Sequence, residues 1–204
     1  MLGAGGHARV LQESLTLAGR ELDSFIALTG ESRLIGVEWL GGEEVLGTLD
    51  PGSVVLVNGI GSVGSLAARK RLFDLGTAAG FAFATVIDAT AVIRPSATIE
   101  RGAQVLAGAI VNSGATIGAD AVINSGAIVE HDCRVGPHSH LSPGAVLAGD
   151  VVVGAETHVG LGARVIQGIS VGSQCVIGAG AVVIRDIPDG FLAVGVPAEA
   201  RTRA

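Results

Sequence analysis

Aromatic residues are almost absent from the chain. Phe, Trp and Tyr make up 3% of its 204 residues, with no Tyr and one Trp, although 49% of the residues are hydrophobic. A core without large rings has to be filled by Val, Ile, Leu and Ala, which suits flat repeated layers better than an irregular globular interior. The scarcity of rings is therefore a first indication of a solenoid.

Positive charge and cysteine are also scarce. The chain carries 13 Lys and Arg against 19 Asp and Glu, for a formal net charge of -6. Because Lys and Arg do not cluster, the composition argues against a nucleic-acid surface. The two cysteines, Cys133 and Cys175, are too few for a disulfide framework, and we expect both to be buried thiols.

Long apolar runs are missing as well. No uninterrupted apolar stretch of about 18 residues occurs, and no basic N-terminal segment leads into one. The pattern predicts neither a membrane span nor a signal peptide, and we expect a cytoplasmic protein. Only Met1 and Leu2 precede a glycine-rich turn of a type that normally follows a complete strand, so we expect a shortened N-terminus.

An aliphatic residue recurs at every sixth position from 87 to 183, and a mostly small residue follows each one by four positions. A period of six predicts a short strand plus a turn, with the aliphatic residue inward and the small one at the corner. Three hexads then form one triangular coil of about 18 residues, and the repeat forms about five coils. The series is Ile87, Ile93, Ile99, Val105, Val111, Ile117, Ile123, Val129, Val135, Leu141, Leu147, Val153, Val159, Val165, Val171, Ile177 and Val183.

The first 84 residues follow a different pattern. An amphipathic stretch runs to about Ala18, apolar strands are expected over residues 25–28 and 54–57, and a helix is expected from Val63 to Ala79. Alternating strands and helices of this length indicate a small Rossmann-like α/β domain with a parallel sheet. With the boundary near Ala84, the predicted domains are 1–84 and 85–204.

The segment Gly3-Ala4-Gly5-Gly6-His7-Ala8 places glycines at the start of the first expected helix. Backbone amides at a helix N-terminus can hold a pyrophosphate. An NAD-binding domain would also need an acidic residue at the end of the second strand, which here reads Phe25-Ile26-Ala27-Leu28-Thr29. We interpret the turn as a contact for the diphosphate of a nucleotide sugar, with a purely structural turn as the alternative.

Within the repeat, Glu130-His131-Asp132 places a histidine beside carboxylates. Acyl transfer from a thioester needs a neutral imidazole to take the nucleophile's proton and a carboxylate to orient that imidazole. We interpret His131 as the general base and Asp132 as its partner, which requires a turn, since adjacent strand residues point to opposite faces. Glu130 is the second candidate partner, and a solvated turn histidine is the alternative.

His140 follows His131 by half a coil, so the two imidazoles should lie on different sides of the triangle. A site that uses both needs a second subunit, which indicates an oligomer, most simply a threefold one. An exposed turn residue is the alternative for His140. With His138 and His158 nearby, the histidine spacing does not match zinc enzymes built on this repeat, so no metal is expected.

Together these motifs resemble the sialic acid O-acetyltransferase and UDP-4-amino-sugar N-acetyltransferase family of hexapeptide-repeat enzymes in bacterial glycan biosynthesis. The resemblance covers essentially the whole chain and implies a left-handed parallel β-helix after the α/β domain. It also implies acetyl-CoA as co-substrate and a homotrimer with sites between subunits. The motifs that carry it are Gly3 to Ala8, Val57-Asn58-Gly59-Ile60-Gly61-Ser62, Glu130 to Cys133, Ser139-His140-Leu141-Ser142 and Gly195-Val196-Pro197-Ala198.

By this resemblance, His131 matches the family's catalytic base, Asp132 the acid that enhances its basicity, and His140 the histidine that meets the thioester. Many relatives carry paired acids where this chain has Leu28-Thr29. The matching cofactor contacts are Gly149, Leu161, Gly178 and Ala179, and the matching nucleotide-sugar contacts are Gly3, Ala4, Gly5, Gly6, His7, Gly59 and Gly61.

The implied activity is direct transfer of an acetyl group from acetyl-CoA to the amine of a nucleotide-linked amino sugar, without a covalent acyl-enzyme. The α/β domain would bind the nucleotide sugar, and the β-helix would bind acetyl-CoA and carry out catalysis. O-acetylation of sialic acid or a related sugar is the alternative within the same class. A non-catalytic nucleotide-sugar-binding or assembly scaffold is the alternative from another class. No nucleic-acid or membrane partner is expected.

Overall fold

The computed structural model describes residues 1–62 and 65–203, which form two compact units divided between Ala89 and Thr90. The division falls shortly after the boundary expected near Ala84. Val63, where the second helix was expected to begin, lies outside the described residues. Of the helices within those two ranges, none is long and apolar enough to cross a membrane.

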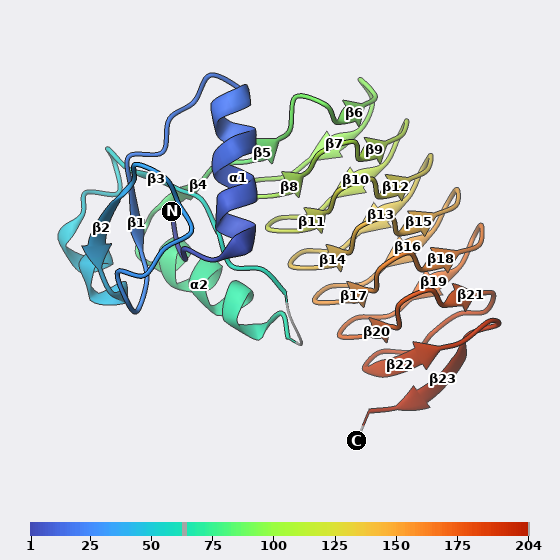
Figure 1. Ribbon diagram of the computed structural model, residues 1–204. Helices are drawn as coiled ribbons and strands as arrows, with labels where there is room; N and C mark the ends of the chain where they lie inside the picture. The colour runs from blue at the N-terminus through green and yellow to red at the C-terminus, as the bar shows by residue number, and fades with distance from the viewer. Residues whose placement is uncertain (63–64, 204) are drawn as a thin grey trace. The chain divides into compact units, whose positions relative to one another are not determined.

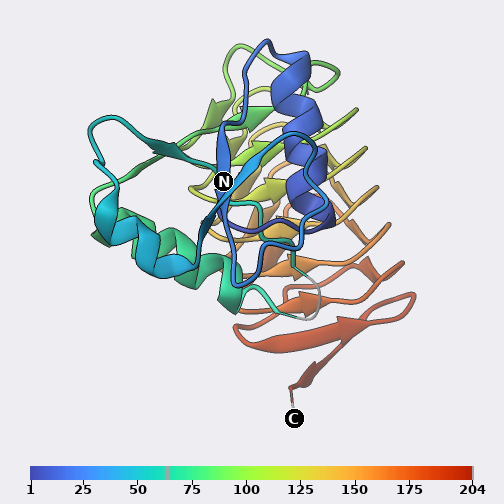
Figure 2. The ribbon, with the colours of Figure 1, turned by 60° about the vertical axis from the view of Figure 1, so that its left-hand side comes forward.

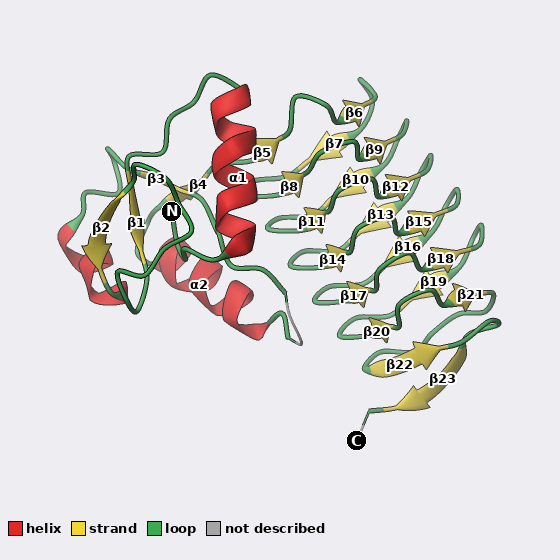
Figure 3. Ribbon diagram, viewed as in Figure 1, coloured by secondary structure: helices red, strands yellow, loops and turns green. Residues whose placement is uncertain are grey.

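The first unit contains a parallel sheet with two helices (Figures 1 and 3). β1 pairs with β2 and β3 pairs with β4, both in parallel, and Leu2 bridges Ile26 on one side and Asn58 on the other. The parallel α/β arrangement predicted for this part of the chain is therefore confirmed. The elements are α1 (Gly6–Leu17), β1 (Ser24–Ile26), β2 (Glu38–Gly41), the 3-10 helix η1 (Glu43–Thr48), β3 (Val55–Leu56), α2 (Ala67–Ala78), β4 (Ala82–Phe83) and β5 (Val86–Ile87).

A buried arginine fixes the loop that follows β3. The Arg69 side chain is 1% exposed, and its Nη1 donates to the carbonyl oxygens of Asn58 and Ile60 at 3.2 and 2.8 Å. In return, Asn58 Nδ2 donates to the Arg69 carbonyl at 3.0 Å. Because a buried charge is tolerated only when it is fully hydrogen-bonded, this exchange holds the loop against α2.

The second unit is a parallel β-helix of very short strands, stacked one above another in Figure 2. From β6 to β21 a new strand begins every six residues, and a final hairpin of two longer strands follows. The strands are β6 (Val92–Ile93), β7 (Thr98–Ile99), β8 (Gln104–Val105), β9 (Ile110–Val111), β10 (Thr116–Ile117), β11 (Val122–Ile123), β12 (Ile128–Val129), β13 (Arg134–Val135), β14 (His140–Leu141), β15 (Val146–Leu147), β16 (Val152–Val153), β17 (His158–Val159), β18 (Arg164–Val165), β19 (Ser170–Val171), β20 (Val176–Ile177), β21 (Val182–Val183), β22 (Phe191–Val194) and β23 (Glu199–Thr202).

Three sheets form the sides of the coil. The β10 sheet runs β7-β10-β13-β16-β19, the β12 sheet runs β6-β9-β12-β15-β18-β21, and the β14 sheet includes β8-β11-β14-β17-β20-β22-β23. Thr116 pairs in register with Thr98 and with Arg134, so each residue lies over the one a full coil away. Three hexads per coil are thereby confirmed.

The inward positions are those that the repeat predicts. From Val105 to Val183 every sixth residue is at most 2% exposed, and the intervening small residues, including the free thiols Cys133 and Cys175, are equally buried. The first three residues of the series are less buried, because no coil is stacked before them: Ile93 and Ile99 are partly buried against the core, and Ile87 is 41% exposed. The expected inward packing of Ile87 was wrong.

A left-handed backbone conformation recurs at every sixth residue from 102 to 180. Each of these residues is the second of a corner turn, where a positive φ costs an L-residue roughly 1–2 kcal/mol and glycine little. This explains much of the glycine content and marks the corners that carry a side chain instead. The positions are Gly102, Gly108, Gly114, Asp120, Gly126, Asp132, His138, Gly144, Asp150, Glu156, Gly162, Gly168, Gln174 and Gly180.

Replacement of an inward aliphatic residue by Asp should unfold the β-helix. Ile117 and Ile123 are fully buried, and a carboxylate there has no partner to offset its desolvation. We expect Ile117→Asp and Ile123→Asp to lose the cooperative thermal transition followed by circular dichroism. Thr116→Asp, on the outward position next to Ile117, is the matched control and should keep it. A soluble Ile117→Asp protein with a normal transition would refute the register.

Candidate active site

His131 and Asp132 form a hydrogen-bonded pair at the corner between β12 and β13. His131 Nδ1–H donates to Asp132 Oδ2 at 3.0 Å, and Asp132 has φ 60. The left-handed turn brings the two neighbouring side chains together, which the interpretation of the pair from the sequence required. It also favours Asp132 over Glu130 as the partner. With its proton held on Nδ1, His131 presents the lone pair of Nε2 as a base.

The pair is open to ligands. The His131 and Asp132 side chains are 54% and 67% exposed. Glycines flank them in the adjacent coils: a methyl group on Gly149 would overlap the His131 imidazole, with Cε1 at 2.5 Å, and one on Gly114 would lie 2.5 Å from Asp132 Oδ1. Gly149, a predicted cofactor contact, therefore lies directly beside the predicted base.

His140 lies in the β14 sheet, on a different side of the coil from the His131 corner. It is 6% exposed, and its Nε2 is 2.9 Å from Asn124 Nδ2. The ring meets that of His158 edge-on, with centroids 5.4 Å apart. Burial lowers the pKa of His158, so that imidazole is neutral at neutral pH. Within one chain, His131 and His140 are not brought together.

The other predicted cofactor contacts gather at a second corner, between the β14 and β12 sheets. Leu161 is 58% exposed there, and its carbonyl accepts the N–H of Gly180 at 2.8 Å, next to Ala179. Gly178 leaves room for Val194, whose Cγ1 would lie 2.7 Å from an added methyl group. Leu161, Gly178 and Ala179 thus lie along one edge of the β12 sheet, and Gly149 along the other.

A second histidine–carboxylate pair was missed by sequence reasoning. His138 Nδ1 lies 3.1 Å from Asp120 Oδ2, at the corner between the β10 and β14 sheets. The pair could have been predicted from the sequence, since the two residues occupy the same turn position in consecutive coils. Their side chains are only 12% and 0% exposed, compared with 54% for His131. The greater accessibility of His131 makes it the better candidate base.

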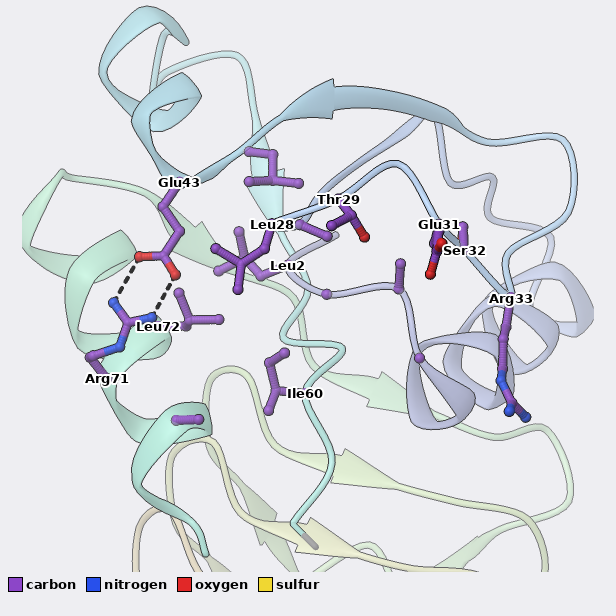
Figure 4. A pocket seen from close by; sticks show the side chains of 16 residues that line it. Leu2, Leu28, Thr29, Glu31, Ser32, Arg33, Glu43, Ile60, Arg71 and Leu72 are labelled. Carbon is purple, nitrogen blue, oxygen red and sulfur yellow. Dashed lines mark hydrogen bonds and ion pairs between the residues drawn. The ribbon is translucent and has the colours of Figure 1, made fainter.

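The first unit contains a pocket of about 600 Å³ (Figure 4). It opens where Leu2, β1 and β3 end, and the carboxyl ends of parallel strands are where α/β sheets bind ligands. Gly3, Ala4 and Gly5 line it, as predicted for a substrate loop. Gly6, His7, Gly59 and Gly61 are not among its lining residues.

The glycines behind the pocket allow two loops to approach closely. Gly59 N–H donates to the Leu2 carbonyl at 2.7 Å, and a methyl group on Gly59 would lie 2.9 Å from Ala8 Cβ. One on Gly61 would lie 3.3 Å from His7 Cβ. These residues therefore position the glycine loop.

Polar residues at the two ends of the pocket carry no sequence motif and were also missed. Arg71 forms a bidentate pair with Glu43 at 2.7 and 2.5 Å, and this hydrogen-bonding holds the pKa of the Glu43 carboxyl below its usual value. Arg33 lies at the opposite end (Figure 4). The Leu2, Leu28, Ile60 and Leu72 side chains lie between.

No cluster of three or more His, Cys, Asp or Glu is arranged to hold a metal ion in the described part of the chain. The chemically distinctive feature is instead an accessible imidazole on a carboxylate, on a β-helix of hexapeptide repeats. This combination defines the class of hexapeptide acyltransferases.

Comparisons with known proteins specify the class further. The family described as bacterial transferase hexapeptide (six repeats) matches residues 114–149. A perosamine N-acetyltransferase mutant from Caulobacter crescentus, solved with CoA and GDP-perosamine, is 37% identical with a TM-score of 0.93, over 99% of this chain and 95% of that one. The acetyltransferase domain of PglB from Neisseria gonorrhoeae, solved with acetyl coenzyme A, is 33% identical with a TM-score of 0.91, over 98% and 97%.

WeeI from Acinetobacter baumannii is 25% identical with a TM-score of 0.82, over 98% of this chain and 97% of that one. Among curated proteins, no sequence matches. The chain belongs to the hexapeptide-repeat sugar acetyltransferases, in which an α/β domain precedes a left-handed β-helix. It is a CoA-dependent sugar acetyltransferase, and the alternative of a non-catalytic scaffold is wrong.

Gly149→Ala should impair catalysis without unfolding the protein. Gly149 does not have a positive φ, so Ala fits the backbone, but its methyl group would displace the His131 ring. A misplacement of about 1 Å costs roughly 100-fold in rate. We expect a fall of that order in acetyl transfer with an unchanged melting temperature. Full activity would mean that the His131 position is not critical.

Proposed function

We propose that this protein transfers the acetyl group of acetyl-CoA to the amine of a nucleotide-linked amino sugar in bacterial surface glycan biosynthesis. The observation that carries the proposal is the accessible His131 imidazole, whose Nδ1 is held by Asp132 so that Nε2 presents its lone pair. The amine is favoured over a sialic acid hydroxyl because a relative that matches nearly the whole chain is a perosamine N-acetyltransferase, solved in complex with GDP-perosamine. Since acetyl-CoA is the donor, the proposed place of action is the cytoplasm.

In the proposed mechanism, the sugar amine attacks the acetyl carbonyl and His131 Nε2 removes its proton. Asp132 stabilises the resulting imidazolium through the Nδ1–H contact. The tetrahedral intermediate then collapses, the C–S bond breaks, and the imidazolium returns its proton to the departing CoA thiolate. No covalent acyl-enzyme forms.

The α/β pocket is suited to the nucleotide sugar. Its apolar middle, with Leu2, Leu28 and Ile60, can contact a base, and the N-terminus of α1 can hold a diphosphate beside Gly3 to Gly5. Arg33, whose side chain has no partner among the described residues, supplies a positive charge at the same end. Gly6, His7, Gly59 and Gly61 shape this loop from behind.

The outer face of the β12 sheet supports self-association. Its outward positions are largely aliphatic, whereas the β10 sheet presents Thr98, Thr116 and Arg134. An apolar sheet face of this extent favours burial against another surface. The outward aliphatic side chains on the β12 sheet are Val92, Ile110, Ile128, Val146, Ile166, Val182 and Ile184, with Arg164 between Val146 and Val182.

A threefold arrangement around this face would complete the active site. The contact would be heterologous, with one edge of each β12 sheet meeting the opposite edge of its neighbour. His131, Asp132 and Gly149 of one copy would then face His140, Leu161, Gly178 and Ala179 of the next. We therefore propose a homotrimer that binds acetyl-CoA between subunits.

The oligomer can be tested on the β12 sheet. Ile128→Glu places a charge in the centre of the proposed interface and should reduce the mass measured by light scattering from that of a trimer to that of a monomer. Val152→Glu, on the β10 sheet, is the matched outward control and should remain trimeric. A trimeric Ile128→Glu protein would place the interface elsewhere.

The activity is tested by thiol release from acetyl-CoA with UDP-, dTDP- and GDP-linked 4-amino sugars and free sialic acid as acceptors. We expect turnover on an amino sugar, and a loss of roughly 100- to 10,000-fold in His131→Ala, as for a general base. Asp150→Asn, a carboxylate at the same corner one coil further on, should stay within about twofold of the native rate. Turnover on sialic acid alone would contradict N-acetylation.

A further inference from the structure

One end of the pocket in the first unit carries a carboxylate that an arginine holds in place. Among the described lining residues the carboxylates are Glu31 and Glu43, and Glu43 lies at the end opposite Arg33 (Figure 4). The Glu43 side chain is 29% exposed, and its two oxygens accept hydrogen bonds from Arg71 at 2.5 and 2.7 Å. These contacts lower the pKa of the Glu43 carboxyl, so it is ionised at neutral pH.

This end of the pocket is a poor place for a phosphate group. The charge of Arg71 is already matched by Glu43, whose carboxylate would repel a phosphate. In the proposed function the diphosphate lies at the other end, by the start of α1 and Arg33. A nucleotide bound in this way lays its base on the apolar middle of the pocket, where Leu28 is 86% exposed and available to cover a ring. The hydrogen-bonding edge of the base then faces Glu43 and Arg71.

The groups on that edge differ from base to base. Guanine presents two adjacent donors, N1–H and the 2-amino group, beside the O6 acceptor. Uracil and thymine present one N–H between two carbonyl oxygens, and adenine and cytosine present one amino group beside a ring nitrogen that accepts. An ionised carboxylate only accepts hydrogen bonds. Glu43 is therefore suited best to guanine, which offers it two donors side by side.

The contact with Arg71 leaves Glu43 able to accept these donors. Each carboxylate oxygen has two lone pairs, and the bidentate contact uses one on each oxygen. The guanidinium lies in a fixed orientation beside the carboxylate, and an outer N–H of Arg71 can donate to O6 of the same base. The 2-amino group distinguishes guanine from the other bases at this site, because in uracil and thymine a carbonyl oxygen would meet the carboxylate instead.

We infer that Glu43 is a specificity-determining residue that recognises a guanine base, and that the acceptor is therefore an amino sugar linked to GDP. This inference rests on the proposed function for the assignment of the pocket to a nucleotide sugar. Arg71 acts as a positioning residue, since it holds the Glu43 carboxylate at the end of the pocket. A site that hydrogen-bonds a ligand group discriminates strongly against an analogue that lacks this group, because its own polar atoms are then left unpaired.

Calorimetric titration with free nucleoside diphosphates tests the inference without acetyl-CoA and without turnover. IDP lacks only the 2-amino group of GDP, so the ratio of the two dissociation constants isolates the contact with Glu43. We expect the native protein to bind GDP about tenfold or more tightly than IDP or UDP, as for a hydrogen bond to a charged group. In Glu43→Ala, which has no carboxylate to accept from the 2-amino group, GDP and IDP should bind within about twofold of each other.

Glu44→Ala is the matched control, because it removes a neighbouring carboxylate that is not among the lining residues, and it should keep the native ratio. An ion pair as exposed as Glu43–Arg71 adds little to stability, so Glu43→Ala should melt near the native temperature. Equal binding of GDP and IDP by the native protein, or a native ratio in Glu43→Ala, would overturn the inference and leave the acetyltransferase proposal standing. If no nucleoside diphosphate binds, the inference and the assignment of the pocket both fail.

Discussion

Stacking of inward aliphatic side chains in exact vertical register is the constraint on which the rest of this β-helix depends. Val105, Ile123 and Leu141 lie over one another in the β14 sheet because each strand pairs with the strands one coil away. The core is filled by small layers and not by rings, so any shift in register would leave cavities or bury polar groups. Because the layers cannot slip, each corner also lies over the next, and His131 lies beside Gly149 for that reason.

The corners carry the chemistry. Most left-handed turn positions are glycine, but Asp132 accepts the unfavourable conformation, and its carboxylate thereby reaches the preceding imidazole. Local strain of this kind is concentrated at functional sites, where the surrounding structure determines it. Asp120 and His138 also occupy left-handed turn positions and form a pair. That pair is buried, whereas the His131–Asp132 pair is exposed. Exposure, and not pairing alone, decides which histidine can meet a substrate.

The repeat could be predicted from sequence nearly strand for strand, because a period of six survives only where every hexad has the same environment. Ile87 departed from the prediction since it lacks a neighbour on one side. The His131–Asp132 pair was also predictable, because it is local. Contacts between distant segments were not: Arg71 with Glu43 and Asn124 with His140 depend on folding, and no motif marks them. Arg33 in the pocket wall was missed for the same reason.

In the proposed trimer, two copies of the chain build each active site. The most direct measurement is complementation between His131→Ala and His140→Ala proteins, each inactive alone, after mixing and reassembly. In random mixed trimers about a quarter of the interfaces would join a native His131 to a native His140, so activity should return to about a quarter of the native level. Mixed trimers that form, as shown by exchange of a mass tag, and remain inactive would contradict a shared site.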